Sequence, residues 1–313
     1  MQEPGDPVRL HSGARTSTGQ IRENNEDNIH LWEQKDAVLA IVADGMGGAA
    51  AGEEASRLAV QAIQDGLTLG ETPLLKALET LGDESVAQRL RAIIRTANLD
   101  IMVRAANDPN LRGMGTTVTL AFVHNAHAIV AHVGDSRAYL VSKLDGKITQ
   151  ITADHSFVEA LVAAGHITEQ QAEEHPMRNV LYRALGQNED VDVDVYQTRM
   201  RRGDRLVMCS DGLTRHVKPP EIAALALQDD DPDRISQRLI DLTNQRGGED
   251  NVSVIVILLE GGGLPSEGDE ETALNAGSDD NEETLVLQDE EREALRRQVH
   301  DGRQPEGGDG HTE

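Results

Sequence analysis

The chain has 313 residues, and 55 acidic against 29 basic side chains give it a formal net charge of −26. Such a charge repels a phosphate backbone and no basic patch offsets it, so composition argues against nucleic-acid binding. The single cysteine, Cys209, excludes an intramolecular disulfide framework and a multi-cysteine zinc site. We find neither a signal peptide nor an apolar run of the roughly 20 residues that span a membrane, so we expect a cytoplasmic protein without a membrane partner.

Short apolar runs that end in turn residues predict strands, and apolar residues at helical spacing predict helices. In chain order, the expected elements are a strand at 37–43, helices at 53–67 and 86–107, strands at 116–123, 128–133 and 138–142, a helix at 157–164, a strand at 205–209, helices at 220–227 and 232–246, and a strand at 252–259. The strands cluster with hairpin connections, which favours α+β layers over a doubly wound parallel sheet. Alternating valines at 191–195 are typical of a half-buried edge strand.

Composition divides the chain after Glu260. Residues 261–313 hold 16 acidic and 4 basic side chains and no aromatic residue. Such a segment cannot bury enough apolar surface to offset its conformational entropy. We therefore predict a folded body at 8–260 and an acidic, disordered tail at 261–313, with at most a short helix near 290–299. Within the tail, Thr284 is a candidate phosphorylation or docking site, and a simply solvated tail is the alternative.

Five turns place an aspartate at or beside a strand end, next to glycine or another small residue. These aspartates are Asp27, Asp44, Asp135, Asp211 and Asp250. Glycine lets the backbone come close, so that a carbonyl oxygen can join the carboxylates as a ligand. Hard oxygen ligands of this kind suit Mg²⁺ or Mn²⁺. The alternative interpretation is five ordinary turns, because Asp and Gly are favoured in loops for local reasons.

The order of several motifs resembles the metal-dependent protein phosphatases of the PPM (PP2C-like) family in their bacterial form. These motifs are Arg22-x-x-x-Glu26-Asp27, Asp44-Gly45-Met46-Gly47-Gly48, Gly115-Thr116-Thr117, Gly134-Asp135-Ser136-Arg137, Asp154-His155-Ser156, Ser210-Asp211-Gly212-Leu213 and Asp250-Asn251. The resemblance covers roughly residues 8–260. It implies an α+β fold with a central β-sandwich of two antiparallel sheets and helices on both outer faces. It also implies hydrolysis of phosphoserine and phosphothreonine in proteins.

The resemblance further implies two tightly bound Mn²⁺ or Mg²⁺ ions. Asp44 would bridge the two ions, and the Gly45 carbonyl would bind the second. Asp211 and Asp250 would complete the protein ligands of the first. A hydroxide shared by two such ions is a strong nucleophile, and the ions neutralise charge on the phosphoryl oxygens.

Other matching positions take supporting roles in the same resemblance. Glu26 would hold the second ion through water, with Asp27 beside the site. Arg22 would grip the substrate phosphate through its planar guanidinium. Asp135 matches the residue that recruits a weaker third metal, and residues 154–190 match a flap region that borders the site.

One position departs from the eukaryotic pattern, since Met46 stands where eukaryotic relatives have histidine. The proton for the leaving group would then come from a metal-bound water or from a flap residue, and the sequence does not choose between them. As partners the resemblance implies phosphorylated proteins, among them a Ser/Thr kinase and its substrates, and we expect a monomer.

Two other functions compete with this interpretation. Residues 209–215, Cys209-Ser-Asp-Gly-Leu-Thr-Arg215, fit the C-x-x-G-x-x-R loop of thiol phosphatases. Asp211 inside that loop would place a negative charge where a phosphate dianion must bind. The second alternative is a catalytically weak binding module, which would require loss of a metal ligand, and Asp44, Asp211 and Asp250 are all present.

Overall fold

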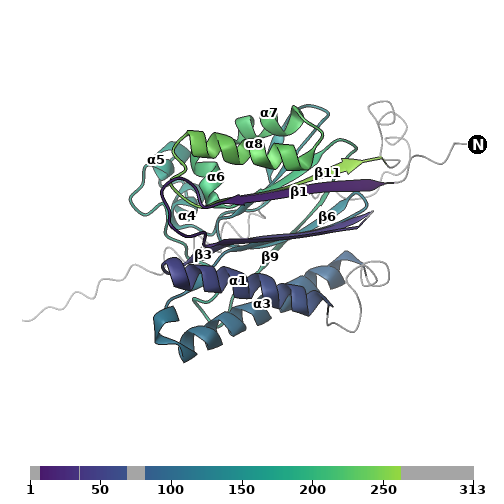
Figure 1. Cartoon of the computed structure of the whole chain (residues 1–313). Helices are drawn as coiled ribbons and strands as arrows, with labels where there is room; N and C mark the ends of the chain where they lie inside the picture. Colours follow the sequence, from purple (N-terminus) through teal and green to yellow (C-terminus); the bar gives the residue numbers. More distant parts are fainter. Residues whose placement is uncertain (1–7, 35, 69–81, 262–313) are drawn as a thin grey trace, which may run out of the picture. The chain divides into compact units, whose positions relative to one another are not determined.

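The computed structural model describes residues 8–34, 36–68 and 82–261 (Figure 1). Its strands are β1 (Arg9–Ser17), β2 (Asp27–Glu33), β3 (Ala37–Met46), β4 (Gly115–Thr116), β5 (Val118–His124), β6 (His127–Val133), β7 (Arg137–Val141), β8 (Ile148–Gln150), β9 (Asp194–Arg199), β10 (Arg205–Cys209) and β11 (Val252–Glu260). Its α-helices are α1 (Ala49–Thr68), α3 (Asp83–Asn107), α4 (Phe157–Ala163), α5 (Glu169–Glu173), α6 (Asp211–His216), α7 (Pro219–Leu227) and α8 (Pro232–Gln245), and a 3₁₀ turn covers Pro109–Leu111.

The strands form two antiparallel sheets. Sheet A has the order β1-β11-β10-β7-β8, and sheet B has the order β2-β3-β5-β6-β9, with β4 paired to β3. Central strands such as β5 and β11 are buried along nearly their whole length. They read as continuous apolar runs because both of their faces are covered, one by the other sheet and one by helices.

Three apolar layers hold this arrangement together. Side chains such as Val42, Val130 and Ile257 fill the space between the two sheets. Helices α1 and α3 pack on the outer face of sheet B. Helices α7 and α8 cover the outer face of sheet A in Figure 1. The expected sandwich with helices on both outer faces is confirmed.

Strand register gathers the motif loops at one end of the sandwich, which we call the loop end. In sheet B, Asp27 lies opposite Asp44 where β2 begins and β3 closes. In sheet A, Cys209 at the end of β10 lies opposite Val254 near the start of β11. The loop end therefore carries the connection 18–26, the turn 134–136, residues 210–212 and the connection 246–251.

The elements predicted in chain order from 37 to 259 are all present, but several others were not expected. Strands β1 and β2 are edge strands with polar, partly exposed side chains. Their sequences lack the apolar run that predicts a strand, because only one edge of each pairs within its sheet. The short elements β8, α5 and α6 were also missed, and the edge strand expected at 191–195 instead runs over Asp194–Arg199.

The described chain divides into two compact units. One holds residues 8–155 and 183–261, and the other holds residues 156–182, which include α4 and α5. The second unit spans fewer residues than the 154–190 flap region that the resemblance implies. Among the described residues, no helix combines the length and apolar character needed to cross a membrane. The predictions for the tail, Thr284 included, lie outside the described residues, apart from Gly261.

Candidate functional site

Asp27 and Asp44 lie opposite each other across the β2–β3 pair at the loop end. Asp27 is buried, and its Oδ2 accepts hydrogen bonds from Ser210 Oγ (2.8 Å) and Ser253 Oγ (2.7 Å) of sheet A. Its Oδ1 is buried without a partner among the described residues. Two carboxylates in directly opposed positions repel each other, and a buried oxygen without a partner is costly. This pair therefore has unused capacity to bind a cation.

The Gly115-Thr116-Thr117 motif fixes the backbone of Asp44. Thr116 Oγ1 donates to the Asp44 carbonyl oxygen (2.8 Å), and Thr117 N donates to the same oxygen (2.9 Å). The Asp44 amide donates to Thr117 Oγ1 (3.0 Å). With its main chain held on both sides, Asp44 projects its side chain from a fixed position.

Asp211 and Asp250 are linked by an arginine that pairs with both carboxylates. Arg215, one turn along α6, contacts Asp211 Oδ2 and lies 3.2 Å from Asp250 Oδ2. Arg22 reaches Asp250 from the other side, at 2.9 Å from Oδ1. The Asp211 and Asp250 side chains are only 18% and 16% exposed, whereas Arg22 is 48% exposed. Both arginines thus neutralise acidic groups that are mostly removed from water.

A close contact between the backbones of Gly45 and Glu26 places Glu26 at the loop end as well. The Gly45 amide donates to the Glu26 carbonyl oxygen (3.2 Å). A Cβ at position 45 would lie 2.1 Å from the Gly52 carbonyl oxygen of α1, so only glycine fits there. Asn251 anchors the other side, because its Oδ1 accepts from the Glu26 amide (2.7 Å) and its Nδ2 donates to the Thr18 and Asn24 carbonyls.

The turn that carries Asp135 is held by a histidine. Gly134 adopts φ +117°, and its amide donates to His155 Nδ1 (3.0 Å) while its carbonyl accepts from the His155 amide (2.7 Å). Beyond the turn, Arg137 Nε and Nη2 form a forked pair with Asp154, at 2.7–3.0 Å. The Asp154-His155 motif is therefore part of the support for the turn.

Burial and mutual repulsion raise the pKa values of three aspartates at the loop end. Burial raises the pKa of Asp27 to about 7, although hydrogen bonds from Ser253 and Ser210 oppose the rise. Burial, followed by the Asp27 and Asp211 carboxylates, raises the pKa of Asp44 well above its usual range. Burial, followed by Asp211, does the same to the pKa of Asp135. A structure that keeps several desolvated carboxylates together favours the uptake of cations.

The residue types at the loop end suit divalent cations, but they do not form a complete set of metal ligands in this arrangement. Within the described ranges, no three His, Cys, Asp or Glu side chains are grouped so that they could hold a metal ion as they stand. The guanidinium groups of Arg22 and Arg215 instead take the cationic positions beside Asp211 and Asp250. The unpartnered Asp27 oxygen and the oxygen-only donor set suit Mn²⁺ or Mg²⁺.

All eight residues expected from the sequence lie at the loop end, but four other contributors were missed. Arg215 was noted only as part of a thiol-phosphatase pattern, and Asn251 only as part of a motif. Ser210 was likewise quoted only within a motif, and Ser253 was not recognised, although both donate to Asp27. A serine in a strand, such as Ser253, gives no signal in sequence, because its partner is set by how the two sheets stack.

Cys209 does not meet the needs of a thiol nucleophile. It lies inside β10 with 0% exposure. Burial raises the pKa of its thiol to about 12, whereas reactive cysteines have a lowered pKa and an accessible sulfur. Its side chain instead packs in the apolar layer between sheet A and the helices α7 and α8.

The fold and the acidic loop end define a class of phosphatase. Residues 16–250 match the family model described as protein phosphatase 2C. The serine/threonine phosphatase stp of Listeria monocytogenes is 37% identical over 249 residues, which cover 79% of this chain and 95% of that protein. The chain belongs to the protein phosphatase 2C family and groups with its bacterial serine/threonine phosphatases.

Solved structures agree with this assignment. The crystal structure of the Mycobacterium tuberculosis serine/threonine phosphatase PstP matches with a TM-score of 0.69 and 38% identity, over 80% of this chain and 99% of that one. The catalytic domain of PstP in complex with two manganese ions matches with a TM-score of 0.68 and 36% identity, over 81% and 99% of the two chains.

Proposed function

We propose that this phosphatase hydrolyses phosphoserine and phosphothreonine in proteins, using two divalent cations held at the loop end. The observation that carries the proposal is the position of buried Asp27 opposite half-buried Asp44, with one Asp27 oxygen unpartnered among the described residues. A bound cation relieves the repulsion between them while both carboxylates stay ionised. Two manganese ions in the similar PstP domain support the number and kind of ion.

Asp44 would bridge the two ions, with the Gly45 carbonyl on the second and Glu26 beside it through water. Asp211 and Asp250 would bind the first ion, once Arg215 and Arg22 give up their places. Asp135, on its own turn, would hold a weaker third ion. When bound, such a pair of ions activates water and neutralises charge on the phosphoryl group.

The chain itself orients the phosphate. Arg22 is nearly half exposed and reaches over Asp250, so its guanidinium can turn to the phosphate oxygens of a substrate. Hydrogen bonds from the Thr116 hydroxyl and the Thr117 amide to the Asp44 carbonyl hold Asp44 in place, which limits the rearrangement needed when substrate binds. The Met46 side chain has no proton to donate, so it does not protonate the leaving oxygen.

The substrates that we propose are phosphoproteins produced by a Ser/Thr kinase, including the kinase itself. The relative from L. monocytogenes is named a serine/threonine phosphatase. Arg22 is an exposed cation at the loop end. We therefore propose that the phosphoryl group, which Arg22 can reach, is the main recognition element.

The test compares the full chain with Asp44→Asn and with the matched control Asp145→Asn, on the β7–β8 turn. In the wild type, calorimetry should show Mn²⁺ binding, and phosphothreonine peptide should be hydrolysed. Asp44→Asn should lose the tight Mn²⁺ sites and at least about 10³-fold in turnover. Its thermal midpoint without metal should not fall, because the substitution removes a repelled charge.

A wild-type protein that binds phosphopeptide but never hydrolyses it, with Mn²⁺ bound, would instead show a binding module. Asp145→Asn should match the wild type in all three measurements. If Asp44→Asn kept its Mn²⁺ sites and its turnover, the ligand assignment would be wrong.

A further inference from the structure

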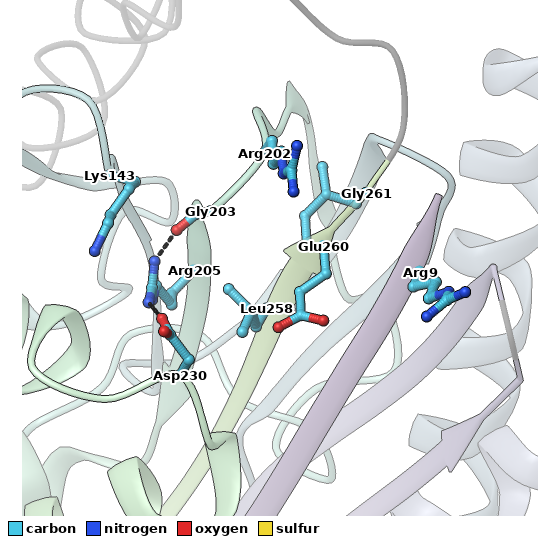
Figure 2. Close-up of a pocket in the computed structure, with 10 residues that line it drawn as sticks. Arg9, Lys143, Arg202, Gly203, Arg205, Asp230, Leu258, Glu260 and Gly261 are labelled. Carbon is cyan, nitrogen blue, oxygen red and sulfur yellow. Dashed lines mark hydrogen bonds and ion pairs between the residues drawn. The ribbon is translucent and has the colours of Figure 1, made fainter. Parts of the chain in front are cut away.

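A cavity of about 440 Å³ lies at the end of sheet A opposite the loop end (Figure 2). It is built where β1 and β10 begin and where β11 ends, and Arg9 pairs in register with Glu260 there. The loop end lies at the other terminus of β11, about 25 Å away at the rise of a β-strand. The cavity is therefore separate from the proposed catalytic site.

Four cationic side chains line this cavity in a chain of net charge −26: Arg9, Lys143, Arg202 and Arg205. Arg205 is fully buried, and its guanidinium is already paired with the protein. Its guanidinium donates to the carbonyls of Ala226 and Asp229 (both 3.1 Å) and to Asp230 Oδ1 (2.6 Å), as Figure 2 shows for Asp230. Arg205 thus supports the cavity wall and leaves binding to the other three.

Arg9, Lys143 and Arg202 are exposed, and none forms an ion pair with another described residue. Two carboxylates also line the cavity: Asp230 pairs with Arg205, and Glu260 lies 3.1 Å from His11, which is charged only when protonated. Arg9, Lys143 and Arg202 therefore outnumber the one remaining carboxylate and make a local positive potential on an acidic protein. The chemistry that fits is an anionic group, such as a cluster of carboxylates.

The chain itself supplies such a group close by. Gly261 lines the cavity, and the sequence continues from it to Glu267, Asp269, Glu270 and Glu271. Six residues span up to about 20 Å, so these side chains can reach the cavity. A short tether gives an effective concentration in the millimolar range, which suffices for weak ion pairs. We propose that this cavity binds the acidic segment 267–271 of the same chain.

The test uses the full chain with a nitroxide spin label on Gly268→Cys. The native Cys209 is fully buried, and labelling of the wild type checks that it takes up no label. We expect an immobilised component in the electron paramagnetic resonance spectrum. The combined change Arg9→Glu, Lys143→Glu and Arg202→Glu should abolish it, and so should about 0.5 M salt, because exposed charges are screened.

The control is Arg199→Glu, a single reversal of an arginine charge at the end of β9, three residues before Arg202, at a position that does not line the cavity. It should keep the immobilised component. A second tail variant, with Glu267, Asp269, Glu270 and Glu271 changed to their amides, should lose it. The three cavity residues are exposed, so their substitution should leave the fold intact, and circular dichroism checks the fold of each variant.

A freely mobile label in the otherwise unchanged protein would overturn the proposal. So would an immobilised component that survives the triple charge reversal. An immobilised fraction that grows with protein concentration would also overturn it, because the acidic segment would then occupy a second copy. Phosphatase activity should be the same in all cavity variants, which separates this test from that of the catalytic site.

Discussion

At the scale of single residues, the loop end keeps acidic side chains partly or fully out of contact with water. Asp27 has one oxygen satisfied by two serines and the other unpartnered among the described residues. Asp44 faces it, and the pKa values of both are raised. Such an arrangement costs stability in the metal-free protein and is typical of a functional site. Arg215 moderates this cost by pairing with two of the neighbouring aspartates.

In the proposed site, Arg215 would compete with the metal for Asp211 and Asp250. Changing Arg215→Gln should strengthen Mn²⁺ binding about fivefold, because an ion pair of about 1 kcal/mol no longer has to be broken. Calorimetric titration of the full chain measures this directly. The matched control is Arg234→Gln, which removes an arginine paired with Asp229 and Asp231 at the start of α8. Weaker Mn²⁺ binding in the Arg215 variant would show that the guanidinium helps to hold the metal ligands in place.

Cys209 provides a second residue-scale prediction. With the thiol buried and its pKa raised to about 12, it cannot act as a nucleophile near neutral pH. Cys209→Ala should keep kcat/KM on phosphothreonine peptide within about twofold, whereas a chelator should abolish turnover in both proteins. A folded, metal-loaded Cys209→Ala protein without activity would restore the thiol mechanism.

At the scale of elements, the site is assembled from several loops that connect different strands and helices. The connection between β1 and β2 carries Arg22 and Glu26, and Asn251 at the start of β11 fastens it at three points. The connection is therefore positioned by sheet A although it leads into sheet B. Loops on a rigid scaffold are a common place for binding groups.

Asn251→Ala should release this connection. Each lost hydrogen bond contributes about 1 kcal/mol, so exchange of the Glu26 amide should quicken by about fivefold or more. The KM for phosphopeptide should rise more than kcat falls, because Arg22 loses its position. Hydrogen exchange and steady-state kinetics measure the two effects. Gln237→Ala, on the exposed face of α8, is the control and should change neither.

At the scale of the whole molecule, the net charge of −26 creates a field that substrates meet before they reach the loop end. Charge of one sign steers oppositely charged partners and slows those of like sign. A phosphopeptide with basic flanks should therefore associate faster than one with acidic flanks.

The corresponding measurement is the salt dependence of kcat/KM for two phosphothreonine peptides that differ only in their flanking charges. Between about 0.05 and about 0.5 M NaCl, kcat/KM for the basic peptide should fall and that for the acidic peptide should stay level or rise. Parallel curves for both peptides would mean that the phosphoryl group alone sets association. A neutral-flanked peptide controls for effects of salt on the catalytic step.

The sequence by itself determined the apolar strands of the sandwich and the acidic turns that follow them. Runs such as 205–209 and 252–259 are long and apolar enough to predict buried strands, and both are present. Family motifs in their order named the eight site residues. These signals are local, because a strand or a turn is coded by neighbouring residues.

Tertiary structure alone decided which side chains serve each acidic group. Ser253 supports Asp27 from 226 positions away, and Asn251 fastens Glu26 across the junction of two sheets. The edge strands β1 and β2 form only because β11 and β3 offer a free edge to pair with. The basic cavity likewise exists because β1, β10 and β11 bring Arg9, Arg202 and Gly261 together. Such contacts depend on register and stacking between distant segments, and no local pattern in the sequence encodes them.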